Sequence, residues 1–174
     1  MSYSIRRLTG EDVEAYRAVR FEALTNHPEA YGSSPERFAA TATESLIDML
    51  SRMAFFGAVT DAGEVAGIVA FGRDEGERER HRGWLFQVYA KPQLRGTGAS
   101  LAMIEAAVEH ARTEVIQVHL MVGAHNTPAI RLYEKAGFKT YGTDPRCLYV
   151  NGRYIDEHMM VRFLDEAPGK TEND

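Results

Sequence analysis

The sequence predicts an α/β fold of one domain, in which a mixed β-sheet is flanked by helices. Two stretches, residues 84–111 and 116–136, each join a strand pattern to a following helix pattern. Two hairpin signals, Asp61-Ala62-Gly63 and Asn151-Gly152, add antiparallel neighbours to the sheet. A length of 174 residues suits one domain with a sizeable core. We expect this domain to occupy residues 1–164.

The first third of the chain is expected to hold one strand followed by helices. Ser4–Leu8 has the pattern of a strand. Thr9, with Asp12 three residues later, resembles a capping box and opens a helix through about Leu24. The elements expected next are a loop from Asn26 to Gly32, a helix that begins at Ser34-Pro35-Glu36, and a helical pattern near Glu44–Arg52.

The central part of the chain is expected to form three strands. Phe55–Thr60 and Val65–Arg73 alternate as strands on the two sides of the first hairpin turn. Asp74–Arg82 carries both charge signs and no apolar residue, which is typical of a solvated loop. Trp84–Ala90 is aromatic and β-branched enough for a buried strand, and Pro92 ends it because proline cannot donate to a ladder.

A turn that contains two glycines, Arg95-Gly96-Thr97-Gly98-Ala99-Ser100, leads from this strand into a helix. Alanines recur at helical spacing from Ala99 to Ala111. The first turn of a helix presents free backbone N–H groups and the positive end of the helix dipole, and both favour an anion. Glycine lets the backbone approach a phosphate closely. The turn therefore predicts a pyrophosphate site.

Two common pyrophosphate motifs do not match this turn. A P-loop needs lysine and then serine or threonine after its last glycine, but Gly98 is followed by Ala99-Ser100. A dinucleotide fingerprint needs a third glycine, and Leu101 occupies that position. The alternative interpretation is a helix whose start is merely rich in glycine.

A second strand and helix follow. Ile116–Val122 has the pattern of a strand. Asn126 or Thr127 can cap the next helix, with Pro128 in its first turn and Gly137 at its end. Tyr133 lies seven residues after Asn126, about two helical turns, so both residues face the same side.

The C-terminal part is expected to complete the sheet. One strand runs from Phe138 to about Tyr141. Cys147–Val150 and Arg153–Leu164 are expected to form a hairpin around Asn151-Gly152. Asp165–Asp174 is polar and is expected to be disordered.

The composition excludes several classes of protein. A hydrophobic content of 44% with 26% charged residues is ordinary for a soluble domain. A single cysteine, Cys147, excludes an internal disulfide and predicts a cytoplasmic protein. No apolar run is long enough to span a membrane, and residues 1–4 lack the layout of a signal peptide. A net charge of −5 disfavours a nucleic-acid partner. His27, His81 and His158 have no metal-ligand partner spacing, so no metal is expected.

With its two motifs in this order, the chain resembles the GNAT superfamily of N-acetyltransferases. The acetyl-CoA loop of that family follows R/Q-x-x-G-x-G/A, here Arg95-x-x-Gly98-x-Ser100, with serine in place of the usual glycine or alanine. The later family motif is N-x-x-A-x-x-L-Y-E-K-x-G-F, which matches the stretch from Asn126 to Phe138. The resemblance covers roughly residues 3–163.

The resemblance implies a mostly antiparallel sheet with splayed central parallel strands, and acetyl-CoA as the cofactor. The pantetheine arm would insert between these strands and pair with backbone groups of Val88 and Ala90, on either side of Tyr89. Asn126 would contact the arm or the acetyl end. The loop residues that would hold the pyrophosphate are Arg95, Gly96, Thr97, Gly98, Ala99, Ser100 and Leu101.

The reaction implied is transfer of an acetyl group to an amine in a ternary complex. Attack of an amine on a thioester builds an oxyanion and expels a thiolate, so a donor is needed for each. By resemblance, the hydroxyl of Tyr133 would protonate the departing sulfur. The alternative is a tyrosine that only packs its ring.

The group that deprotonates the amine is not obvious from the sequence. Relatives that acetylate ribosomal proteins carry a glutamate at the position of Met121, which cannot accept a proton. His119, on the same strand face, is the best single candidate, and Glu157 comes next. The alternative for His119 is a half-buried strand residue. We expect a water chain linked to such groups rather than one dedicated base.

Acceptor recognition is expected from the first helices and the last hairpin. The polar and aromatic candidates there are Glu22, Tyr31, Ser33, Tyr154 and Asp156. Small-molecule amines and the N-termini of peptides or proteins are both considered as acceptors. A homodimer is a further alternative for the oligomeric state. No nucleic acid or membrane is expected as a partner.

A different class of function is a non-catalytic acyl-CoA sensor or interaction module on the same fold. Tyr133 beside Asn126 argues against it, because a sensor needs no acid for a leaving group. A regulatory domain that binds the phosphates of another nucleotide is a more remote alternative.

Overall fold

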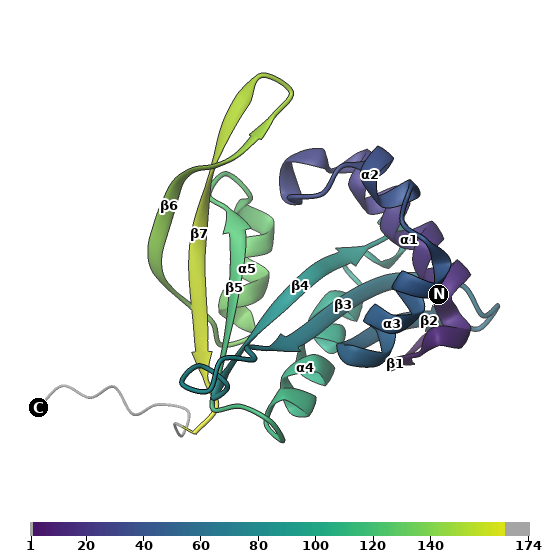
Figure 1. The fold of residues 1–174 in the computed structure, drawn as a ribbon, viewed down its shortest axis with the longest axis horizontal. Helices are drawn as coiled ribbons and strands as arrows, with labels where there is room; N and C mark the ends of the chain where they lie inside the picture. Colours follow the sequence, from purple (N-terminus) through teal and green to yellow (C-terminus); the bar gives the residue numbers. More distant parts are fainter. Residues whose placement is uncertain (1, 166–174) are drawn as a thin grey trace, which may run out of the picture.

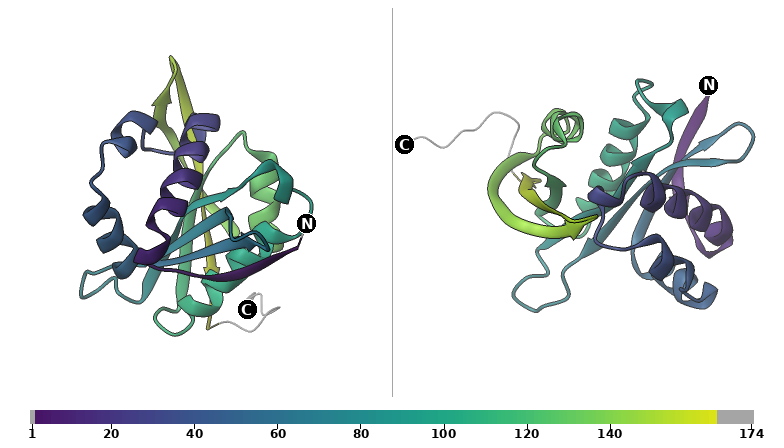
Figure 2. Two further views of the ribbon diagram at one scale, coloured as in Figure 1. Left: turned by 90° about the vertical axis from the view of Figure 1, so that its right-hand side faces the viewer. Right: turned by 90° about the horizontal axis from the view of Figure 1, so that it is seen from above.

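The computed structural model describes residues 2–165, which form a seven-stranded mixed sheet with helices on both faces (Figures 1 and 2). The strands are β1 (Tyr3–Leu8), β2 (Ala54–Thr60), β3 (Val65–Arg73), β4 (Arg82–Ala90), β5 (Gln117–Gly123), β6 (Lys139–Val150) and β7 (Arg153–Phe163). The helices are α1 (Val13–Asn26), α2 (Pro35–Ala39), α3 (Thr43–Arg52), α4 (Ala99–Ala111) and α5 (Thr127–Lys135), with short 3₁₀ turns η1 (Gly10–Asp12), η2 (Pro28–Ala30) and η3 (Pro92–Leu94).

The sheet has the order β1-β2-β3-β4-β5-β7-β6. β4 and β5 are parallel, and the other neighbouring strands are antiparallel. The predicted fold class, a mostly antiparallel sheet with a central parallel pair, is therefore confirmed.

The two central strands separate soon after they meet. Pairing between β4 and β5 runs only from Arg82↔Gln117 to Trp84↔His119. Figure 1 shows the far ends of the two strands diverging. The predicted splay is therefore present, and it leaves one edge of each strand unpaired beyond Trp84 and His119.

A bulge in β4 bends this strand beyond its paired end. Its register with β3 shifts between Ile68 and Ala70, and Gln87 has a positive φ of 55°. Positive φ is strained for a residue with a side chain, and a bulge bends its strand. The Tyr16 hydroxyl donates a hydrogen bond of 2.8 Å to Oε1 of Gln87 and holds this conformation.

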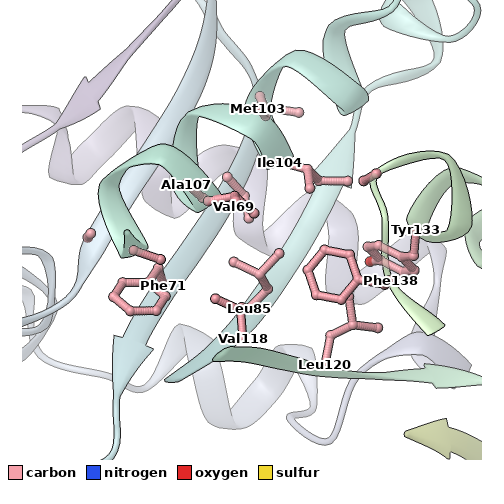
Figure 3. Close-up of a cluster of buried hydrophobic side chains, with 14 of the residues drawn as sticks. Val69, Phe71, Leu85, Met103, Ile104, Ala107, Val118, Leu120, Tyr133 and Phe138 are labelled. Atoms are coloured by element: carbon pink, nitrogen blue, oxygen red, sulfur yellow. The ribbon is translucent and has the colours of Figure 1, made fainter. Parts of the chain in front are cut away.

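Each face of the sheet has its own hydrophobic core. α4 and α5 cover one face, where Met103 and Ile104 pack with Leu120, Tyr133 and Phe138 (Figure 3). The second core lies on the opposite face and is covered by α1, α2 and α3. Figure 2 shows α1 and α4 on opposite sides of the sheet.

The start of the first helix differs from the prediction in one respect. The capping box of Thr9 and Asp12 is present, but it opens the 3₁₀ turn η1, and the α-helix begins at Val13. Arg6 also pairs with Asp12 at 2.7 Å, so the carboxylate serves both the turn and β1. The predicted loop over 26–32 contains η2.

The C-terminal hairpin is longer than predicted. The sequence predicted two short strands before Asn151, whereas β6 is one strand with two irregularities in its register with β7. Arg146 has a φ of 54°, and its N–H donates to Oδ1 of Asp156 at 2.8 Å. Bulges of this kind tolerate Pro145 within a strand. Of the tail predicted to be disordered, all but Asp165 lies outside the described residues.

Candidate active site

A cleft of about 800 Å³ opens where β4 and β5 separate. This volume is within the range of small-molecule sites. β4 lines it over residues 84–90, and the end of β5 and the start of α5 line the other side. η2 with the residues around it, Arg20 of α1, Arg95 and Ser100 complete the walls.

The predicted anion loop has the backbone geometry that its sequence requires. Gly96 and Gly98 have φ values of 74° and 86°, and Gly98 is the N-cap of α4. Neither glycine has a neighbouring atom closer than 3.9 Å to the position of an added Cβ. The backbone N–H groups of Gly96, Gly98, Ser100 and Leu101 donate no hydrogen bond within residues 2–165. The loop therefore offers unpaired donors and open space, which fits a pyrophosphate.

The side chain of Thr97 serves the turn itself. Its hydroxyl donates to the carbonyl of Leu94 at 2.7 Å and accepts from the N–H of Ala99 at 3.3 Å. The hydroxyl of Tyr3 on β1 donates to the Thr97 carbonyl at 3.3 Å. The Thr97 N–H also donates to the Leu94 carbonyl at 3.3 Å, so Thr97 shapes the loop and adds no free donor to it.

The three residues of β4 that were predicted to meet the cofactor lie along the cleft. Val88, Tyr89 and Ala90 all line it. The carbonyl of Val88 accepts a hydrogen bond of 2.8 Å from the Tyr31 hydroxyl. A carbonyl oxygen has two lone pairs, so a second bond from a ligand remains available. The side chain of Tyr89 is buried in the core that α1 covers.

Asn126 and Tyr133 both line the cleft from α5. The Asn126 side chain caps the helix by accepting from the N–H of Ala129 at 3.3 Å, as the sequence predicted. Tyr133 is 7% exposed, and its ring packs edge-on against Phe138 at 6.2 Å. No hydrogen bond of its hydroxyl to a described residue contributes to its pKa. Burial raises its pKa well above the usual range, so the hydroxyl holds its proton at neutral pH.

His119 does not line the cleft, which corrects the sequence-based choice of a base. It lies at the paired end of β5, opposite Trp84, where the cleft has not yet opened. An amide N–H of Gln117 donates to Nε2 at 2.8 Å, so Nδ1 carries the proton toward the Tyr141 hydroxyl at 3.1 Å. Burial and the nearby Arg82 lower the pKa of His119. The lone pair that a base needs is already occupied.

Three predicted residues of the last hairpin also lie outside the cleft lining. Glu157 is buried and accepts from the Cys147 thiol at 3.1 Å. Asp156 is exposed and caps the bulge at Arg146. Tyr154 is 62% exposed and packs against Tyr149 at 4.9 Å. As strand alternation predicts, only one of the two carboxylates is buried. That carboxylate, Glu157, contacts the Cys147 thiol and not the cleft.

The candidates from the first helices are divided in the same way. Tyr31 lines the cleft, whereas Glu22 and Ser33 do not. Glu22 accepts from the Tyr89 hydroxyl at 2.9 Å and pairs with Lys91 at 3.1 Å, so its carboxylate is already satisfied. Ser33 is exposed.

Several polar residues in the cleft were missed by the sequence analysis. They are Arg20, His27, Glu29, Gln87 and His125. Arg20 occupies a position of α1 whose neighbours at helical spacing are core residues, and this was the signal available. No group of three potential metal ligands occurs within residues 2–165, and no helix of that part is long and apolar enough to cross a membrane.

Comparison with known proteins adds a family assignment. A sequence model described as the Acetyltransferase (GNAT) family matches residues 18–138. An L-methionine sulfoximine/L-methionine sulfone acetyltransferase of Pseudomonas paraeruginosa is 29% identical over 180 residues, 95% of this chain and 96% of the relative. A mycothiol acetyltransferase of Thermobispora bispora is 32% identical over 139 residues, 78% of this chain and 45% of the relative.

The fold is also similar to solved structures. One of them is yncA of Salmonella typhimurium, described with its cofactor acetyl-CoA, which matches with a TM-score of 0.82 and 19% identity. The match covers 99% of this chain and 100% of that one. At this level of identity the similarity shows the fold alone.

Proposed function

The chain belongs to the acetyltransferase (GNAT) family of acyltransferases, and we propose that it transfers an acetyl group from acetyl-CoA to the primary amine of a small molecule. The observation that carries the proposal is the cleft between β4 and β5. One continuous space there is lined by part of the anion loop, by the unpaired edge of β4 and by Tyr133. The named relatives act on small molecules, which supports the same acceptor size here.

Acetyl-CoA, when bound, supplies a thioester as the acyl donor. The free N–H groups of the Gly96–Leu101 turn, with Arg95 beside them, would hold the negative charges of the pyrophosphate. The open edge of β4 at Val88 and Ala90 offers backbone groups to an amide-containing arm, in the manner of an added strand. These contacts orient the donor without any catalytic side chain.

Tyr133 is proposed to protonate the departing sulfur. The role requires a hydroxyl that is protonated at neutral pH and is not bonded elsewhere. Burial raises its pKa, and no hydrogen bond to a residue among 2–165 contributes to that pKa. Proton transfer by a positioned group typically contributes about 10²- to 10⁴-fold in rate.

We propose that no single side chain removes the amine proton, and that water molecules carry this proton to several titratable groups. Met121 lines the cleft but cannot accept a proton. The titratable groups that do line it at this end are His27, Glu29 and His125, on two different sides. His27 and Glu29 are 3.9 Å apart. These residues replace His119 and Glu157 as the groups to which a water chain would lead.

Release of free CoA thiol from acetyl-CoA tests the proposal, measured over a panel of amines. We expect amine-dependent thiol release with at least one small amine and an N-acetylated product by mass spectrometry. Tight acetyl-CoA binding with no turnover on small amines or on peptide N-termini would instead indicate an acyl-CoA sensor. Turnover on peptides alone would contradict the small-molecule acceptor.

A further inference from the structure

Arg20 is a buried cation without an anionic partner in the described part of the chain. It lies on the inner face of α1 and is 6% exposed, between core positions such as Val19 and Ala23. Its guanidinium forms no hydrogen bond and no ion pair with the residues that the structure describes, and its Nη1 is fully enclosed. Leaving a buried charge unpaired is costly. Such a charge in a binding cleft is a sign of an absent ligand group.

The contacts of Arg20 compensate its charge only in part. The guanidinium carbon lies 4.4 Å from the ring centroid of Tyr31, a cation–π contact. The hydroxyls of Tyr16 and Tyr31 donate to Gln87 and to the Val88 carbonyl, and neither forms a hydrogen bond with Arg20. Burial lowers the pKa of Arg20, but a guanidinium stays charged at neutral pH.

Arg20 borders the part of the cleft where the chemistry is proposed to occur. Its side chain lines the cleft together with Tyr31 and Tyr133. Tyr31 links the two, because it contacts Arg20 and is close enough to Tyr133 to raise the pKa of that hydroxyl further. The anion loop follows β4 after Ala90 and has its own backbone donors with Arg95 beside them, so a pyrophosphate there does not require Arg20.

The charges around the cleft disfavour a polycationic acceptor. Among the described residues that line it, Glu29 is the one carboxylate, whereas Arg20 and Arg95 are both cations. A polyamine would require several carboxylates. An acceptor with one amine and one anionic group matches the set better, with Glu29 near the ammonium and Arg20 near the anion.

We infer that Arg20 binds a carboxylate of the acceptor, so that the substrate class is an α-amino acid or a compound with the same pairing of amine and anion. The inference rests on the proposed function for its reaction, but not for its binding step. The planar guanidinium fork matches a carboxylate with two parallel hydrogen bonds. Arg20 is thereby a specificity-determining residue.

The test compares amino acids with their α-carboxamides, which keep the amine and remove the charge. L-methionine sulfone, L-methionine and L-phenylalanine are each assayed beside the corresponding amide. We expect a kcat/KM about 10- to 100-fold higher for the acids, the scale of a charge-assisted hydrogen-bond pair. In Arg20→Gln the ratio should fall to near one, and in Arg20→Lys to an intermediate value.

Arg17→Gln is the matched control, because Arg17 lies one turn earlier on α1 and bonds to Thr41 and Thr43, outside the cleft. It should leave the acid-to-amide ratio unchanged. If Arg20→Gln does not fold, the acid-to-amide ratios of kcat/KM in the wild type and in Arg20→Lys still test the inference. A wild-type ratio near one, or a high ratio that persists in Arg20→Gln, overturns the inference while the proposed function stands.

Trp84, the only tryptophan, lines the same cleft and gives a readout without turnover. Its fluorescence should respond to amino acids at concentrations where the amides have no effect, and this difference should vanish in Arg20→Gln. If no amine is acetylated but this binding pattern appears, the proposed function fails and the inference about Arg20 stands. Equal responses to acids and amides overturn it.

Discussion

The two ends of the cleft are built in different ways. The anion end consists of consecutive residues, and its donors are backbone N–H groups set by two glycines with positive φ. The acceptor end is made of side chains from α1, η2, β4, β5 and α5, which are distant in the sequence. A site made of backbone depends on local conformation, whereas a site made of side chains depends on how the whole fold packs. The two ends should therefore respond differently to substitution.

Gly98→Trp should have the largest effect, because it acts on the backbone end. The position has a φ of 86°, and a bulky side chain there would fill the space of the phosphates. Loss of two charge-assisted hydrogen bonds would weaken acetyl-CoA binding by about 100-fold or more. Isothermal titration calorimetry measures the change.

Gly63→Trp is the matched control for this substitution. Gly63 has a similar φ of 81° with nothing within 4 Å, but it lies in the β2–β3 turn. Backbone strain is therefore comparable, and acetyl-CoA affinity should be unchanged. Equal affinity in a folded Gly98→Trp variant would show that the loop does not hold the pyrophosphate.

Tyr133→Phe should come next, because it removes one hydroxyl and keeps the ring packing on Phe138. We expect turnover to fall by roughly tenfold or more, with acetyl-CoA affinity unchanged. Tyr141→Phe, outside the cleft lining, should change turnover by less than about twofold. Equal turnover of wild type and Tyr133→Phe would return this tyrosine to a packing role.

His119→Gln should have a smaller effect on rate. His119 lies outside the cleft with both ring nitrogens bonded, so turnover should fall by tenfold or less and the rise of the rate with pH should remain. A loss near a thousandfold, together with loss of that rise, would identify His119 as a dedicated base after all.

His119 should instead affect stability at acid pH. Burial lowers its pKa in the folded state below the unfolded value of about 6.5. As the pH falls below this value, the unfolded chain gains a proton that the folded chain resists, so the free energy of unfolding decreases. Urea unfolding at pH 7.5 and 5 should show a smaller decrease in His119→Gln than in wild type.

Glu22→Gln should have the smallest effect. Glu22 is bonded to Tyr89 and Lys91, away from the cleft. Partly exposed ion pairs contribute little, so we expect a loss of no more than about 1 kcal/mol in unfolding free energy. The KM for the acceptor should stay within about twofold of wild type. A large rise in KM without loss of stability would place Glu22 at the acceptor after all.

The anion end of the cleft could be predicted from the sequence more fully than the acceptor end, because only the anion end consists of consecutive residues. The turn at 95–101 and the cap at Asn126 are local patterns, and the structure shows their predicted geometry. His119 was misplaced because strand alternation gives the face of a residue but not how far along the strand the partner pairs.

Arg20 was missed for a related reason. In the sequence, an arginine on a helix is most often solvent-exposed, and only the packing of α1 against the sheet reveals that its charge is enclosed. Glu22 was placed at the acceptor end from its position in the chain, but Tyr89 and Lys91 from β4 and its end occupy its carboxylate.

The unpaired edges of β4 and β5 also affect how the protein behaves when no ligand is present. Backbone donors and acceptors on an open strand edge can pair with the strand of another chain, which is a route to aggregation. A ligand that occupies the edges removes that route and stabilises the folded state by mass action. Shelf life and yield of the purified protein should therefore increase with the concentration of free acetyl-CoA, and amide protons along the open edge of β4 should exchange with solvent more slowly in its presence.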